Sequence, residues 1–134
     1  MIYPTNVKHL FEMRLRDIRK EGEVKKRSRW LGIWRSRWAV LDGHFLFTFK
    51  RKPSTNEEQP TEVLNLKEFT CEEAKIGSPY CFKLSNNMES FFLDVDSNKE
   101  RIAWIRAIYG CVREHQPLSF SDYEDNDVSA TNLA

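Results

Sequence analysis

The densest cluster of charge in the sequence is a basic segment, Lys25–Arg37, and no acidic residue occurs between Val24 and Leu41. A guanidinium can hold a phosphate through two hydrogen bonds, and a lysine ammonium adds a mobile point charge. Side chains of these two types therefore suit an anionic ligand that carries several phosphates. The segment contains six of them: Lys25, Lys26, Arg27, Arg29, Arg35 and Arg37.

Two of these arginines have the spacing of a ligand-binding strand. Arg35 and Arg37 lie between Trp34 and Trp38, and side chains two residues apart on a strand point to the same face. A hairpin partner that carries Lys26 would bring a third charge to that face. A charge run is often only solvated surface, and that alternative stays open. The alternation within an aromatic strand favours a site for an anionic lipid, because solubility alone does not require it.

Three apolar residues lie near the expected tip of the same hairpin: Trp30, Leu31 and Ile33. One interpretation places them in the core. The other makes them a membrane-inserting loop, because apolar residues beside basic ones can enter the headgroup region, where tryptophan is enriched. Large aromatic residues in regular elements are usually buried, so we expect core positions for Trp34, Trp38 and Trp104.

No pattern in the sequence is typical of catalysis or of a metal site. The three histidines are scattered, and none is paired with a cysteine or carboxylate at a ligand spacing. The cysteines Cys71, Cys81 and Cys111 are odd in number and lack a CxxC motif, which disfavours a disulfide framework and a zinc site. We therefore expect no enzymatic activity, no metal and no other cofactor, with reduced thiols in a cytosolic protein.

The charge of the chain is divided between its two parts. The net charge of the 134 residues is only +1, but residues 1–52 hold 14 of the 21 basic and 5 of the 20 acidic residues. This balance argues against a nucleic-acid binder that is basic throughout, and the acidic remainder would repel nucleic acid. It favours a polarised surface that faces an anionic partner. No apolar run is long enough to span a membrane, and the start does not resemble a signal peptide.

The periodicity of apolar residues predicts a mainly β domain between two extensions. Residues 5–18 have helical spacing and predict a short amphipathic helix that docks on its own domain or on a partner. Seven strands are expected at 21–27, 34–41, 44–50, 62–66, 69–74, 79–85 and 90–96, with a hairpin turn at Asp42-Gly43. Phe45, Phe47 and Phe49 share one face, as core or as a packing face for the N-terminal helix. Ser97 and Glu100 predict the start of a long last helix, and the acidic tail is expected to be disordered.

The order of these features resembles a pleckstrin homology (PH) domain over residues 19–115. The resemblance rests on a Lys-x-Gly start, a basic loop, an aromatic strand with alternating arginines, a turn and a tryptophan in the last helix. These are Lys20, Gly22, Lys26–Gly32, Trp34–Trp38, Leu41, Leu46-Phe47 and Trp104. It implies a seven-stranded, bent antiparallel barrel capped by one C-terminal helix. The domain organisation then is an N-terminal helix in 1–18, the PH domain in 19–115 and an acidic tail in 116–134.

Members of that family that bind phosphoinositides share a Lys followed by Arg-x-Arg on the second strand, and here Lys26, Arg35 and Arg37 match. The resemblance implies a headgroup pocket between the first two strands, to which Lys25, Arg27 and Arg29 add charge. We therefore expect a cytoplasmic module that binds phosphoinositides peripherally on the cytosolic face of membranes. The open alternatives are a sensor of phosphatidic acid or of anionic lipid in general, and a protein-interaction adaptor that uses the N-terminal helix or the acidic tail.

Overall fold

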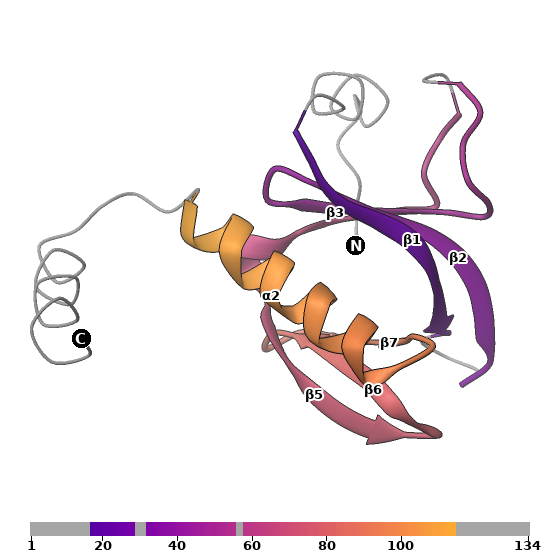
Figure 1. Cartoon of the computed structure of the whole chain (residues 1–134), viewed down its shortest axis with the longest axis vertical. Helices are drawn as coiled ribbons and strands as arrows, with labels where there is room; N and C mark the ends of the chain where they lie inside the picture. The colour runs from indigo at the N-terminus through magenta and orange to yellow at the C-terminus, as the bar shows by residue number, and fades with distance from the viewer. Residues whose placement is uncertain (1–16, 29–31, 56–57, 115–134) are drawn as a thin grey trace, which may run out of the picture.

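The computed structural model describes residues 17–28, 32–55 and 58–114, and its centre is one antiparallel sheet (Figure 1). The strands follow the order β4-β3-β2-β1-β7-β6-β5, so β4 and β5 form its two edges. The strands are β1 (Ile18–Arg27), β2 (Trp34–Asp42), β3 (Phe45–Phe49), β4 (Glu62–Asn65), β5 (Thr70–Ile76), β6 (Ser78–Ser85) and β7 (Ser90–Asp94). This confirms the prediction of a mainly β fold with seven antiparallel strands.

One long helix, α2 (Asn98–Glu114), follows the strands and lies across the open side between the two halves of the sheet (Figure 1). Its start is capped as the sequence predicts, because the backbone N–H of Glu100 donates to the hydroxyl of Ser97 at 3.1 Å. The helix contacts β1, β5, β6 and a short 3-10 helix, η1 (Leu66–Glu68). None of the described helices is long and apolar enough to cross a membrane.

The main core lies between α2 and the side of the sheet that we call the inner face. Trp104 is almost fully buried there, with 1% of its surface exposed. A Cβ added at Gly22 would lie 4.0 Å from the Trp104 ring, an ordinary van der Waals distance, so this strand position faces the ring. The inner-face residues include Val24, Ala39, Leu41, Leu46, Leu64, Cys71, Phe82, Leu84, Phe91 and Leu93.

A second apolar cluster lies on the opposite side of β2, β3 and β4, which we call the outer face. It contains Val40, Phe47, Phe49 and Val63, with Phe45 and Trp38 packed against them. The three phenylalanines of β3 therefore share one face, as their spacing predicts. The expected core position is confirmed for Trp104. For Trp34 and Trp38 it is wrong, because these two side chains are only half-buried. Their side of β2 faces away from the main core, and Trp38 packs against the second cluster without being buried in it.

The start of β1 differs from the prediction. The sequence predicts a helix up to residue 18 and a strand from residue 21. In the structure Ile18 already pairs with Asp42, and Lys20 pairs with Leu41. The backbone N–H of Gly43 also donates to the carbonyl of Asp17 at 3.1 Å. These ladder contacts make residues 18–20 part of the strand. Residues 1–16 of the predicted N-terminal segment and the acidic tail in 116–134 lie outside the described residues.

The three cysteines are free and buried. Cys71 and Cys111 belong to the main core, and Cys81 lies on β6. Burial raises the pKa of all three thiols, to about 12 for Cys71 and about 11 for Cys111. Removal from water penalises the thiolate, so these side chains serve as small apolar core residues.

Candidate functional site

The register of the first hairpin brings three of the predicted ligand residues to one face. In β1, Lys26 lies two residues after buried Val24. In β2, Arg37 and Arg35 lie two and four residues before buried Ala39. All three basic residues therefore belong to the inner face, where the strands run beyond the core toward the end of the sheet. Lys26 pairs with Arg35, and Val24 pairs with Arg37.

The other predicted basic residues do not join this group. Lys25 pairs with Ser36 and Arg27 pairs with Trp34, and both lie on the outer face by alternation. The guanidinium carbon of Arg27 lies 6.0 Å from the centroid of Phe92, an outward residue of β7. Arg29 lies outside the described residues. The basic segment is thus divided into an inner-face triad, which is Lys26, Arg35 and Arg37, and a separate outer-face pair.

Lys26 has an enclosed position in the inner-face triad. Its ammonium lies 4.9 Å from the ring centroid of Phe91 and 2.8 Å from a carboxylate oxygen of Glu62. The exposed fractions of the two side chains are only 16% for Lys26 and 13% for Glu62. Arg35 is exposed and Arg37 is half-buried. The exposed Arg35 can therefore reach a ligand from solvent, and a guanidinium nitrogen of Arg37 donates to the carbonyl of Ser36 at 2.8 Å.

Glu62 was not identified from the sequence. It begins β4, where it pairs with Thr48 of β3. Thr48 is buried, and its hydroxyl lies 2.9 Å from the hydroxyl of Thr61. The backbone N–H of Thr61 also donates to the carbonyl of Thr48 at 2.7 Å. These two contacts fix the start of β4 and place the Glu62 side chain against Lys26.

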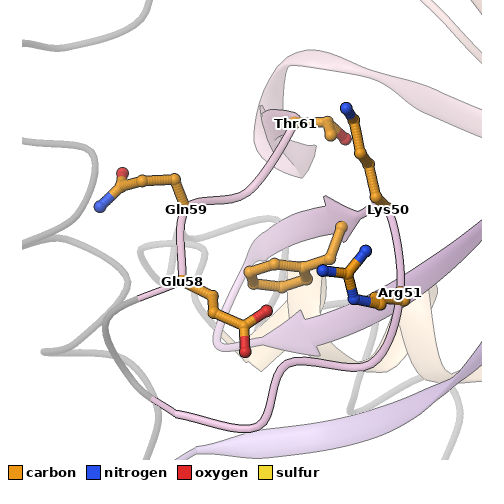
Figure 2. A pocket seen from close by; sticks show the side chains of 6 residues that line it. Lys50, Arg51, Glu58, Gln59 and Thr61 are labelled. Atoms are coloured by element: carbon orange, nitrogen blue, oxygen red, sulfur yellow. The ribbon is translucent and has the colours of Figure 1, made fainter.

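The β3–β4 loop forms a shallow pocket of about 250 Å³ near the same end of the sheet. Figure 2 shows Lys50, Arg51, Glu58, Gln59 and Thr61 around it. Trp38 pairs with Phe49, so the pocket begins next to the β2 end that carries Arg37. None of the ligand residues predicted from the sequence lies in this loop. The basic run directly after β3 was the signal that could have identified it.

The pocket also contains a carboxylate that accepts hydrogen bonds within the loop. Glu58 accepts hydrogen bonds from the backbone N–H and the hydroxyl of Ser54, both at 2.7 Å. These bonds lower the pKa of Glu58 below its usual value. Glu58 is therefore ionised at neutral pH, and it holds the loop in shape.

The predicted loop tip is only partly described. Ile33 has 46% of its surface exposed, so this residue does not belong to the core. The backbone N–H of Ile33 donates to the hydroxyl of Ser28 at 3.0 Å, and the N–H of Ser28 donates to the carbonyl of Ile33 at 2.7 Å. These contacts close the base of the loop. Trp30 and Leu31 lie outside the described residues.

The PH domain family model matches residues 18–113 of the chain. The chain belongs to the PH domain family. Its relatives include the serine/threonine-protein kinase pakC of Dictyostelium discoideum, which is 33% identical over 92 residues, or 66% of this chain and 18% of the kinase. They also include pleckstrin homology domain-containing protein 1 of Arabidopsis thaliana, which is 27% identical over 101 residues, or 72% of this chain and 70% of that protein. The chain thus spans less than a fifth of the kinase.

Two solved PH domains with bound inositol phosphates have the same fold. The C-terminal PH domain of pleckstrin, in complex with D-myo-Ins(1,2,3,5,6)P5, has a TM-score of 0.63 and 22% identity, and the similarity covers 71% of this chain and 95% of that chain. The PH domain of Slm1, in complex with inositol-4-phosphate, has a TM-score of 0.60 and 23% identity, and the similarity covers 69% of this chain and 93% of that chain. These similarities establish the architecture of this PH domain.

Proposed function

We propose that this PH domain binds phosphoinositide headgroups through Lys26, Arg35 and Arg37 and so brings itself, or an attached protein, to a membrane. The observation that carries the proposal is the register of β1 and β2, which gathers these three cations on one face. An inositol polyphosphate presents several dianionic groups around a small ring, and each arginine can hold one of them bidentately. The inositol phosphates in the pleckstrin and Slm1 complexes lend support to this ligand class.

The proposal gives separate roles to the two faces of the first hairpin. The inner-face triad recognises the headgroup, whereas Lys25 and Arg27 add general attraction to an anionic surface. A basic residue near such a surface contributes about 1 kcal/mol at most. Exposed charges are screened within about 8–10 Å at cellular ionic strength. General attraction is therefore weak and sensitive to salt. Recognition by the triad depends on the positions of its three charges and not only on the net charge.

The exposed Ile33 supports a membrane anchor at the loop tip. In the proposal Trp30, Leu31 and Ile33 insert between headgroups while the triad holds the phosphates. Burying one such side chain contributes about 1.5–3 kcal/mol. This contribution resists salt, so the two parts together give stable attachment. The chain acts in this account as a peripheral binding module on the cytosolic face of a membrane, and no catalytic step is assigned to it.

Arg37→Ala tests the proposal in a vesicle flotation assay. The panel contains vesicles with each phosphoinositide, with phosphatidic acid, and with phosphatidylserine alone. Loss of one charge-assisted phosphate contact costs about 1.5–3 kcal/mol, which lowers affinity roughly tenfold or more. Arg106→Ala, at an exposed position of α2, is the matched control. Unchanged phosphoinositide binding by a folded Arg37→Ala variant contradicts the proposal, and equal binding to all anionic vesicles favours a general anionic-lipid sensor.

A further inference from the structure

The ammonium of Lys26 is in contact with a carboxylate of its own chain. The Lys26–Glu62 pair has an N–O distance of 2.8 Å, and both side chains are more than four-fifths buried. The other ion pairs formed by the described strands are more open, such as Lys83–Glu72 with exposed fractions of 31% and 59% and Lys20–Glu100 with 20% and 46%. The contact of Lys26 with Glu62 thus occupies the ammonium that a headgroup phosphate would approach.

The backbone that carries Glu62 has little freedom to move. Thr61 is bonded to Thr48 through both its backbone and its hydroxyl. The next two residues, Val63 and Leu64, are buried on opposite faces of the sheet, in the outer and the main core respectively. A shift of β4 would disrupt both clusters. Glu62 can therefore leave Lys26 only by rotation of its own side chain toward the solvent at the edge of the sheet.

A phosphate and a carboxylate compete for the positive charge of the Lys26 ammonium. Both present anionic oxygens to an ammonium, and both form short charge-assisted hydrogen bonds with it. If Glu62 stayed in place beside a bound phosphate, two negative charges would lie within a few ångströms of each other in a poorly hydrated site. Such a like-charge pair is unfavourable. Binding of a phosphate at Lys26 thus requires Glu62 to turn away.

From this geometry we infer that Glu62 is a built-in competitor for the headgroup, an internal carboxylate that a phosphate must displace from Lys26. The inference rests on the proposed function and adds a residue that limits affinity. When only a fraction of the molecules has the competent conformation, the apparent dissociation constant is raised by the reciprocal of that fraction. Glu62 lowers the affinity of the site in this way, so ligands with few phosphates bind too weakly to hold the domain at a membrane.

Glu62→Gln tests the inference, because glutamine keeps the shape of the side chain and removes its charge. The probe is soluble D-myo-Ins(1,2,3,5,6)P5, the ligand in the pleckstrin complex, titrated calorimetrically into the full chain. We expect the dissociation constant to fall about tenfold, the size of one charge-assisted contact. Glu72→Gln is the matched control, since it removes the same charge from another strand glutamate that is paired with a lysine.

A second background separates competition from a general change of net charge. If Glu62 acts through Lys26, then Glu62→Gln should have little effect on affinity in a Lys26→Met chain. Thermal unfolding checks that each variant is folded, and Glu62→Thr, with a residue favoured in strands, replaces the glutamine variant if that one does not fold. Phosphoinositide vesicles repeat the comparison with the lipid-borne headgroup.

The outcomes are distinguishable. Tighter binding by Glu62→Gln alone supports the inference, and so does binding by Glu62→Gln where the unchanged chain shows none. If the wild type binds and Glu62→Gln binds equally or more weakly, the inference is overturned. The Lys26–Glu62 pair is then structural, and the proposed function stays intact. An equal gain in Glu72→Gln overturns it as well. If neither the wild type nor Glu62→Gln binds the pentakisphosphate or the vesicles, both the inference and the proposed function fail.

Discussion

Lys26 and Arg35 lie directly opposite each other in the β1–β2 ladder, on the face of the sheet that carries the main core. Directly paired residues of antiparallel strands have Cβ atoms about 4.5–5.5 Å apart. Both side chains are cations, so they repel each other across the ladder. The structure relieves part of the repulsion, because Glu62 neutralises Lys26 and Arg35 extends into solvent. A multivalent anion would relieve the rest, and for this reason we propose that the pair binds phosphates.

The division of the basic segment between two faces predicts different effects for two adjacent lysines. Lys26→Ala should weaken binding of soluble inositol polyphosphate about tenfold or more, because a charge-assisted contact is lost. Lys25→Ala, on the outer face, should change that affinity by about twofold at most, in line with an exposed charge. Calorimetric titration of both variants measures the difference. Equal losses would mean that net charge, and not the inner face, determines binding.

The loop tip should contribute to membrane attachment without recognising the headgroup. Replacing Trp30, Leu31 and Ile33 together by serine should weaken binding to phosphoinositide vesicles, above all at high salt, where charge attraction is screened. Titration with soluble inositol phosphate should give nearly the wild-type affinity. A parallel drop in both affinities and in melting temperature would instead show that these residues support the core.

Much of the candidate site could be predicted from the sequence, because it depends on strand alternation. Arg35 and Arg37 have the same parity as Ala39 and Leu41, so their face follows once β2 is recognised. The alternation also divides Lys25 from Lys26. The number of strands and the last helix followed from the same reasoning, since turn residues and periodicity are local signals.

Glu62 could not be predicted in this way. Strand β4 is covered on both faces, so Val63 and Leu64 are both apolar. The strand therefore lacks an alternation of polar and apolar residues that would show which face Glu62 occupies. Its partner Lys26 is in β1, three strands earlier in the chain, and only tertiary structure brings the two residues together. Ile18 was assigned to a helix because its apolar spacing continues that of the preceding residues, whereas its place in β1 depends on pairing with β2.

The helix tryptophan should dominate the stability of the domain. Trp104→Ala should lower the free energy of unfolding by about 3–5 kcal/mol, the usual cost of truncating a buried aromatic residue. Trp34→Ala, at a half-buried position of β2, should cost less. Urea unfolding followed by circular dichroism gives both values. Equal destabilisation by the two changes would contradict the position of Trp104 at the centre of the main core.

The buried thiols predict a loss of stability at alkaline pH. The ordinary thiol pKa near 9 describes the unfolded chain, whereas burial raises the pKa of Cys71 to about 12 in the folded protein. Between these values the folded state retains a proton that the unfolded state has lost, so the free energy of unfolding falls as pH rises from about 9 to 12. Urea unfolding from pH 8 to 11 should show a smaller decline in Cys71→Ala. The same decline in both proteins would exclude this thiol as its source.

The central claim, that the inner-face triad holds the headgroup, is tested most directly by the side-chain Nε–H signals of the arginines in a nuclear magnetic resonance titration. Soluble D-myo-Ins(1,2,3,5,6)P5 is added to the full chain, and the signals are assigned by single Arg→Lys substitutions. Our account predicts that the signals of Arg35 and Arg37 shift together and saturate at one equivalent of ligand, whereas that of Arg27 on the outer face stays in place. Shifts confined to Arg27, or no saturable shift of Arg35 and Arg37, would contradict it.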